Sequence, residues 1–277
     1  MSERGKVVVG MAGWTYPAWR GGFYPKGLVQ KRELEYAATQ VTSIELNGSF
    51  YALQKPASWK NWRDSTPDDF VFSVKAPKFI THIRRLDDVH EPLANFFASG
   101  ILSLGSKLGA VLWQLPPSLE FEPYLLEHFL EQLPHTTTDA VSLAKERSAR
   151  MSGKEHLETD SDRPVRHALE VRHSTFASPD FPKLLAKYDV AAVYGDSAGK
   201  WPVIDEVTTD FRYARLHADK ALYPDGWYEP ADIDRWATMI EEWLGAGQDA
   251  YIYFDNDAKV RAPIDAVSLI ARLSRQS

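Results

Sequence analysis

TSIELNGSFY, residues 42–51, alternates apolar and polar side chains as far as Gly48. Glu45 and Asn47 therefore share one face of a predicted β-strand, and the apolar side chains take the other. We expect the strand to end at Gly48 and residues 49–51 to form a loop. Polar groups are costly in a strand that is buried on both faces, and an α/β barrel places its chemistry where its strands end. The same pair would also suit a structural role, in which it braces the top of the barrel.

The rest of the chain alternates between strand and helix patterns on either side of this stretch. The other predicted strands are 6–11, 70–75, 109–114, 167–173, 190–194, 211–217 and 250–255, and the predicted helices are 31–40, 56–65, 93–104, 121–133, 138–151, 180–189, 230–244 and 263–273. This order predicts a closed (β/α)8 TIM-type barrel that forms a single domain over residues 1–277. The alternative is an open doubly wound sheet, but Gly10 and Gly13 do not form its glycine-rich dinucleotide fingerprint.

A long aromatic loop follows the first predicted strand. Residues 14–25, WTYPAWRGGFYP, are too many for a simple connection, which indicates a binding loop or a lid. Trp14 and Tyr16 are the expected binding side chains. Phe23 and Tyr24 fit better with a loop that packs its own aromatic rings over the barrel rim.

Composition limits the classes of function. The 277 residues are 44% hydrophobic and include no cysteine, which excludes disulfides, thiolate metal sites and cysteine nucleophiles. The net charge of -6 argues against a general nucleic-acid coat, although a local basic cleft stays compatible with it. No apolar run has membrane-spanning length, so we expect a soluble cytoplasmic protein without a membrane partner. Phosphate-binding P-loops and nucleophile elbows are also missing.

Polar side chains recur late in successive strands. The set comprises Glu45, Asn47, Ser73, Lys75, Gln114, Glu170, Arg172, Asp196, Arg215, His217 and Asp255. Several members are two residues apart, so each such pair should face the barrel axis together. Burying so many charges is costly unless they are compensated. The pattern therefore predicts either a functional site or a network in which the carboxylates neutralise the lysine and the arginines.

Short motifs spread along the chain resemble those of the YecE-like family, domain of unknown function seventy-two. They are GMAGWTY at 10–16 with FYP at 23–25, IELN at 44–47 with FY at 50–51, TH at 81–82, QLPP at 114–117, LEVRH at 169–173 and RLH at 215–217. The resemblance implies a TIM-type barrel and no established reaction. Two positions differ: Ala218 stands where the family usually has glycine, and Asp255-Asn256 replaces the usual Asn-Asn, which adds a negative charge to the expected site.

The preferred hypothesis is an enzyme that acts on a small phosphorylated or carboxylated substrate, such as a sugar derivative. Arginine guanidinium groups and a lysine would bind the anion. Carboxylates in unlike environments would act as general acid and base, and a histidine would transfer a proton near neutral pH. The predicted catalytic residues are Glu45, Glu170, His217 and Asp255. The predicted substrate-binding residues are Trp14, Tyr16, Asn47, Tyr51, Lys75, His82, Gln114, Arg172, Asp196 and Arg215. No cofactor and no metal ligand are assigned.

Two alternatives stay open. The first is a metal-dependent phosphodiesterase resembling Endonuclease IV, whose divalent metal would bind Glu45, Glu170, Asp196, His217 and Asp255. Against it, His217 is the one well-placed histidine, and the neighbouring lysine and arginines would repel a cation cluster. The second is a binding module without turnover, which would hold a metabolite or, less favoured, a nucleic-acid end. Its aromatic surface would comprise Trp14, Tyr16, Trp19, Tyr51 and Trp201. The oligomeric state is not predicted.

Overall fold

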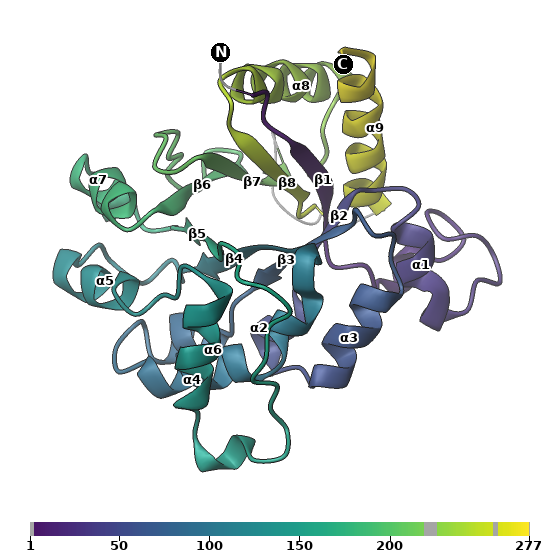
Figure 1. Cartoon of the computed structure of the whole chain (residues 1–277). Coiled ribbons are helices and arrows are strands. Elements are labelled where there is room, and N and C mark those ends of the chain that lie inside the picture. Colours follow the sequence, from purple (N-terminus) through teal and green to yellow (C-terminus); the bar gives the residue numbers. More distant parts are fainter. Residues whose placement is uncertain (1–2, 219–225, 257–259, 277) are drawn as a thin grey trace.

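The computed structural model describes residues 3–218, 226–256 and 260–276, and it contains a closed parallel barrel (Figure 1). Its strands are β1 (Val7–Ala12), β2 (Ser43–Leu46), β3 (Val71–Lys75), β4 (Leu108–Gln114), β5 (Arg166–Glu170), β6 (Val190–Ser197), β7 (Phe211–Ala218) and β8 (Asp249–Phe254). They follow one another around the ring, and β8 pairs in parallel with β1. The predicted TIM-type barrel is confirmed, and the open sheet is wrong because β8 closes the ring.

Helices surround the ring of strands (Figure 1). They are α1 (Glu33–Ala37), α2 (Gly48–Tyr51), α3 (Pro56–Asp64), α4 (His90–Ala98), α5 (Pro123–Leu130), α6 (Thr137–Lys145), α7 (Asp180–Lys187), α8 (Pro230–Gly245) and α9 (Arg261–Gln276). Proline occupies the first turn of α3, α5 and α8, where its missing N–H costs nothing. Short helical segments lie between them, among them η1 (Pro17–Trp19), η3 (Phe79–Ile83) and η4 (Ile101–Lys107). In the described part of the chain, no helix is long and apolar enough to cross a membrane.

Several predicted boundaries are wrong. Residues 48–51 form the short helix α2 and not a loop, and His82 lies in the single turn η3. Thr136 caps α6 by accepting a hydrogen bond from the Asp139 backbone, so this helix begins one residue before its predicted start at residue 138. These errors concern single turns, where local hydrogen bonds compete with the pattern.

The helix predicted over residues 93–104 is divided at Gly100. The backbone of Gly100 has φ +108°, so α4 ends at Ala98 and η4 begins at Ile101. A Cβ atom on Gly100 would lie 2.7 Å from the Pro56 Cα atom and 2.9 Å from Trp59. The close approach of α3 therefore requires glycine here, and the chain turns where the apolar pattern alone would continue.

The barrel interior combines a small apolar cluster, which includes Leu112 and Val193, with hydrogen-bonded polar side chains. Small inward side chains lie near the Tyr213 and Tyr253 rings; they include Ala110, Ala168 and Ala191. The Tyr253 hydroxyl lies 2.6 Å from Ser43 Oγ and donates to Ser73 Oγ at 2.8 Å. The larger apolar core lies outside the ring, between the strands and the helices. The hydroxyls of Tyr213 and Tyr253 thus connect this apolar cluster to polar groups nearer the strand ends.

Candidate functional site

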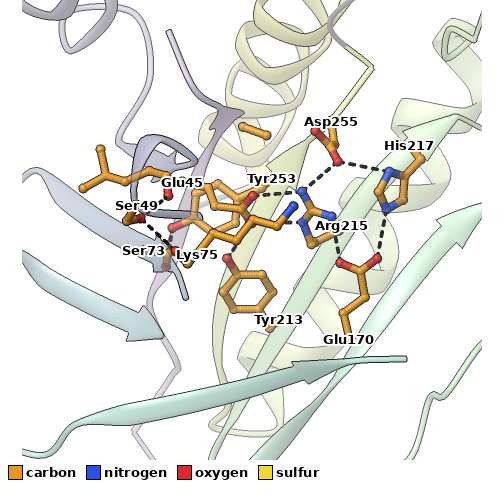
Figure 2. Close-up of polar contacts among 12 residues, drawn as sticks. Glu45, Ser49, Ser73, Lys75, Glu170, Tyr213, Arg215, His217, Tyr253 and Asp255 are labelled. Carbon is orange, nitrogen blue, oxygen red and sulfur yellow. Dashed lines mark hydrogen bonds and ion pairs between the residues drawn. The ribbon is translucent and has the colours of Figure 1, made fainter. Parts of the chain in front are cut away.

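Arg215 lies at the centre of the polar group at the carboxyl ends of the strands, which we call the barrel mouth (Figure 2). Its guanidinium is fully buried and binds three carboxylates. Nε and NH2 donate to the two oxygens of Glu45 at 3.0 and 2.9 Å, NH1 donates to Glu170 at 2.7 Å, and NH2 also donates to Asp255 at 2.7 Å. The bidentate pair with Glu45 is the geometry in which arginine binds a carboxylate most strongly. Although burial disfavours its charge, the three carboxylates raise the pKa of Arg215 well above its ordinary value.

Glu45 lies beneath the guanidinium, with no exposed surface. Besides the two bonds from Arg215, it accepts one from the Tyr213 hydroxyl at 2.7 Å. Tyr213 and Arg215 are two residues apart on β7 and point inward together, as strand alternation requires. All the surroundings of Glu45 are therefore protein groups, and no substrate could touch it without displacing Arg215.

His217 lies next to Arg215 and is held between two acids. Its Nδ1 atom is 3.2 Å from Asp255, and Nε2 lies 3.6 Å from Glu170, too far for a hydrogen bond. Burial opposes the charged imidazole, but Asp255 and Glu170 outweigh it and raise the pKa of His217. The reverse holds for both acids: burial favours their neutral forms, yet Arg215 above all keeps the pKa of Glu170 and of Asp255 well below the ordinary value. Both acids therefore stay ionised.

Arg172 joins the same group from the segment after β5. Its Nε atom donates to Glu170 Oε1 at 2.9 Å, and its NH2 atom forms an ion pair with the same oxygen at 2.8 Å. Its guanidinium carbon lies 3.9 Å from the centre of the Trp201 ring. Trp201 in turn meets His217 edge to face at 5.2 Å. Within the described residues, NH1 of Arg172 has no protein partner. Arg172 is thus oriented by an acid and an aromatic ring while one of its donor groups stays available.

Lys75, the last residue of β3, is the least compensated charge in the barrel mouth. Only 9% of the residue is exposed, and its ammonium lies 4.5 Å from the centre of the Phe50 ring. In the described ranges it has neither a hydrogen bond nor an ion pair, whereas its backbone carbonyl accepts from Ser49 Oγ at 2.7 Å. Burial, followed by repulsion from Arg215, lowers the pKa of Lys75. At a given pH, the neutral amine form is therefore more populated for Lys75 than for an ordinary lysine.

An open cavity of about 720 Å³ covers this group. It is lined by Gly13, Trp14, Thr15, Tyr16, Asn47, Gly48, Phe50, Tyr51, Lys75, His82, Gln114, Arg172 and Asp255. Of the four predicted catalytic residues, only Asp255, whose side chain is 20% exposed, reaches the cavity wall. Glu45, Glu170 and His217 lie beneath it. All the predicted substrate-binding residues line the cavity except Asp196 and Arg215.

Two further polar side chains of the cavity wall have capacity to bind a ligand. Asn47 Oδ1 is buried without a hydrogen-bond partner. His82 Nδ1 lies 2.8 Å from Thr81 Oγ1, and its Nε2 lies 3.5 Å from the Gln114 side-chain nitrogen. Burial, followed by the Lys75 charge, lowers the pKa of His82. His82 is accordingly a neutral imidazole at pH 7, facing the same space as Lys75.

The aromatic loop after β1 has two layers. Trp19 and Tyr24 are fully buried and pack on each other with ring centres 6.3 Å apart, which agrees with a loop that packs its own rings. Trp19 therefore cannot serve as the binding surface suggested for a nucleic-acid module. Tyr16 lines the cavity and donates its hydroxyl to the Ala12 carbonyl at 2.6 Å. Tyr51, from α2, is 70% exposed at the cavity edge.

Asp196 does not belong to this group, which corrects the prediction. β6 continues to Ser197, and Asp196 pairs in register with Leu216, whose side chain lies in the outer core. Its carboxylate accepts hydrogen bonds from Tyr228 and Trp236 on the helix side of the barrel. The predicted strand ended at residue 194, so the alternation of its side chains was not extended to Asp196. That alternation places Asp196 on the outer face of the barrel, whereas Arg215 and His217 face the interior.

A divalent cation does not fit among the buried carboxylates as they stand. Glu45, Glu170 and Asp255 all point at the guanidinium of Arg215, so a metal ion there would have to displace a buried cation. The described ranges contain no group of three or more potential metal ligands. Three of the five ligands suggested from the sequence, Glu45, Glu170 and Asp255, are thus the groups that bind Arg215. A fourth, Asp196, lies on the helix side of the barrel.

Some contacts within the site were not predicted. Phe50 lies beneath the Lys75 ammonium, Trp201 covers Arg172, and the hydroxyl of Tyr213 binds Glu45. The position of Tyr213, two residues before Arg215, was a usable signal. Trp201 was expected to belong to an aromatic binding surface, but its contact with Arg172 was not predicted. That contact, like the one between Phe50 and Lys75, depends on how α2 and the segment after β6 fold over the barrel mouth.

Comparison with known proteins identifies relatives of this chain. A family model described as "Protein of unknown function DUF72" matches residues 8–277. UPF0759 protein YecE of Escherichia coli K12 is 33% identical over 133 residues, which make up 46% of this chain and 44% of YecE. UPF0759 protein YunF of Bacillus subtilis is 22% identical over 280 residues, which make up 91% of this chain and 89% of YunF. The match to YecE thus spans less than half of that protein.

Solved structures agree with the fold. The crystal structure of a Thermotoga maritima protein of the same family has a TM-score of 0.77 at 22% identity and covers 97% of this chain and 99% of its own. An Enterococcus faecalis protein of that family has a TM-score of 0.73 at 15% identity and covers 97% and 95%. At these identities, the comparison concerns the backbone fold.

Proposed function

The chain belongs to the DUF72 family, whose function is unknown, and from this premise we propose that it is an enzyme acting on a small anionic substrate in the barrel mouth. One observation supports the proposal. Arg172 NH1 and the Lys75 ammonium have no protein partner in the described residues, and both residues line the same cavity. A buried charge that lacks a partner is costly, and an anionic ligand would offset that cost. We take the substrate to be phosphorylated or carboxylated and sugar-like.

The roles differ from the sequence-based hypothesis. Glu45 and Glu170 serve as positioning residues, because both bind Arg215 and neither lines the cavity. Proton transfer falls to His82, since a neutral imidazole is a competent base near neutral pH. Asp255, held ionised by Arg215 and His217, stabilises positive charge that develops on the substrate side of the cavity.

Anion binding is tested first with inorganic phosphate as the probe. Arg172→Gln should weaken phosphate binding by about 10- to 100-fold, which is the usual range for a lost hydrogen bond to a charged group. Arg275→Gln, which removes the same charge from an exposed site on α9, should leave binding unchanged. Isothermal titration calorimetry measures both. Equal affinities for the two variants would contradict the anion site.

Turnover is tested separately, because a module that only binds would pass the first test. A panel of sugar phosphates and sugar acids is incubated with the protein in heavy water, and proton NMR follows deuterium entering the ligand. We expect incorporation with the wild type and its loss in His82→Gln. Binding of the panel without exchange or conversion would favour the binding module, and retention of an oligonucleotide through purification would favour nucleic acid.

A further inference from the structure

We propose that Lys75 is a nucleophile that forms a Schiff base with an aldehyde or ketone substrate. The proposal rests on the function proposed above, since it takes the anion site around Arg172 as the group that holds the substrate. It narrows the substrate class to carbonyl compounds that carry a carboxylate or a phosphate, such as 2-oxo acids and keto phosphates.

The first support is the isolation of the Lys75 ammonium. Arg215 satisfies all three acids of the barrel mouth, and Arg172 adds a second cation to Glu170. Lys75 is left with an aromatic ring on one side and the cavity on the other.

The second support is the way Lys75 is activated. Lysine becomes a nucleophile when it is desolvated in an apolar pocket or lies beside another cation, and here both conditions hold. Phe50 supplies the apolar contact, and Arg215 supplies the fixed positive charge. The lowered pKa of Lys75 agrees with this geometry. Ser49 fixes the end of the strand by donating to the Lys75 carbonyl, which orients the side chain toward the cavity.

The chemical step balances without any oxidant or reductant. The neutral Nζ atom attacks the carbonyl carbon, forming a C–N bond while the π electron pair moves to oxygen. One amine proton passes to that oxygen to give a carbinolamine. A second proton, supplied by solvent, lets the oxygen leave as water, and the nitrogen lone pair forms the C=N bond. The iminium keeps the single positive charge of the ammonium, so Asp255, Glu45 and Glu170 stabilise it as they stabilise the protonated lysine.

His82 and Asp255 are placed to use this intermediate. An iminium withdraws electrons from the neighbouring carbon and acidifies its C–H bond. His82 lines the same cavity as Lys75 and is neutral at pH 7, so it is the expected base for that proton. Deuterium exchange next to the carbonyl is therefore a consequence of the covalent step.

The experiment traps the intermediate with sodium cyanoborohydride, using glyoxylate and dihydroxyacetone phosphate as probes. Peptide mass mapping of the wild type should locate the reduced adduct at Lys75. Its rate should exceed that of an exposed lysine by about tenfold for each unit by which its pKa is lowered. Lys75→Arg, which keeps the charge but has no nucleophilic amine, should lose the adduct. Lys78→Met, which removes the exposed neighbouring lysine near Tyr51, should label like the wild type.

The pH dependence of labelling separates nucleophilic reactivity from mere accessibility. The rate at Lys75 should level off at a lower pH than the rates of the other lysines, with Arg215, His82, Asp255, Glu45 and Glu170 as the charged or titratable groups that set its position. Labelling spread evenly over the lysines would overturn the proposal. If phosphate still binds through Arg172 in that case, the anion site stands and only the covalent role of Lys75 fails. If neither phosphate nor the probes bind, both proposals fail.

Discussion

Arg215 shows how one side chain can set the charge of its surroundings. Three buried carboxylates share its guanidinium, so none of them is an uncompensated charge. The arrangement leaves Arg172 and Lys75 as the cations available to a ligand. At the scale of the residue, the ion network around Arg215 thus lies directly beneath the cavity of the proposed functional site, and Asp255 belongs to both.

Replacing Arg215 by methionine should be severely destabilising. Glu45 would stay buried with Tyr213 as its remaining donor, and removing one partner of a buried ion pair commonly costs about 3–5 kcal/mol. Urea unfolding measures the loss. Combining Arg215→Met with Glu45→Gln should recover part of it, because the buried negative charge is then gone. A single variant within about 1 kcal/mol of the wild type would show that the network contributes little.

His217 should make stability depend on pH in a defined direction. Its folded pKa lies above the ordinary 6.5, so its ion pairs contribute fully below pH 6.5 and are lost as the pH rises through the folded value. The gap in unfolding free energy between the wild type and His217→Gln should therefore shrink as the pH rises from 6.5. Chemical denaturation at several pH values measures it. His90→Gln, at an exposed histidine, is the control, and a gap that widens would reverse the assignment.

At the scale of the elements, the ends of helices and strands do not always follow the apolar pattern of the sequence, and Gly100 is one such case. The apolar spacing from Leu93 to Leu104 continues through Gly100, but the chain turns there because α3 leaves no room for a side chain. β6 is the opposite case, since it continues past its predicted end and places Asp196 on the outer face. Neither the break at Gly100 nor the extension of β6 could be predicted from the neighbouring sequence. Each depends on contacts with an element that is distant in the chain.

Gly100→Ala should lower the free energy of unfolding by about 2–4 kcal/mol, combining a left-handed backbone with a clash against Pro56 and Trp59. Gly245→Ala, at the end of α8 with nothing within 4 Å of its new Cβ atom, should be neutral or slightly stabilising. Thermal and urea unfolding of both variants provide the comparison. Similar effects from the two changes would show that the conformation of Gly100 is not specifically required.

At the scale of the whole molecule, the order of strands and helices was predictable, and so was the convergence of charges on one end of the barrel. The i, i+2 spacing of Arg215 and His217 correctly placed them on one face. Which of these charged side chains form ion pairs with one another was not predictable. Which acid meets Arg215 depends on the stagger of strands across the barrel, and Glu45 and Arg215 come from opposite halves of the chain.

The bond between Glu45 and Arg215 has a consequence for synthesis on the ribosome. The two residues are 170 positions apart, so Glu45 emerges roughly 10–30 s before its partner at ordinary elongation rates. Until Arg215 has been synthesised, the unpaired Glu45 carboxylate is more stable in water than in a buried position. We therefore expect the amino-terminal half of the chain to stay unfolded during that time. Stalled nascent chains that end before residue 215 should remain sensitive to protease near β2, and chains that extend beyond β8 should become resistant. Early protection would mean that the first strands assemble without their distant cation.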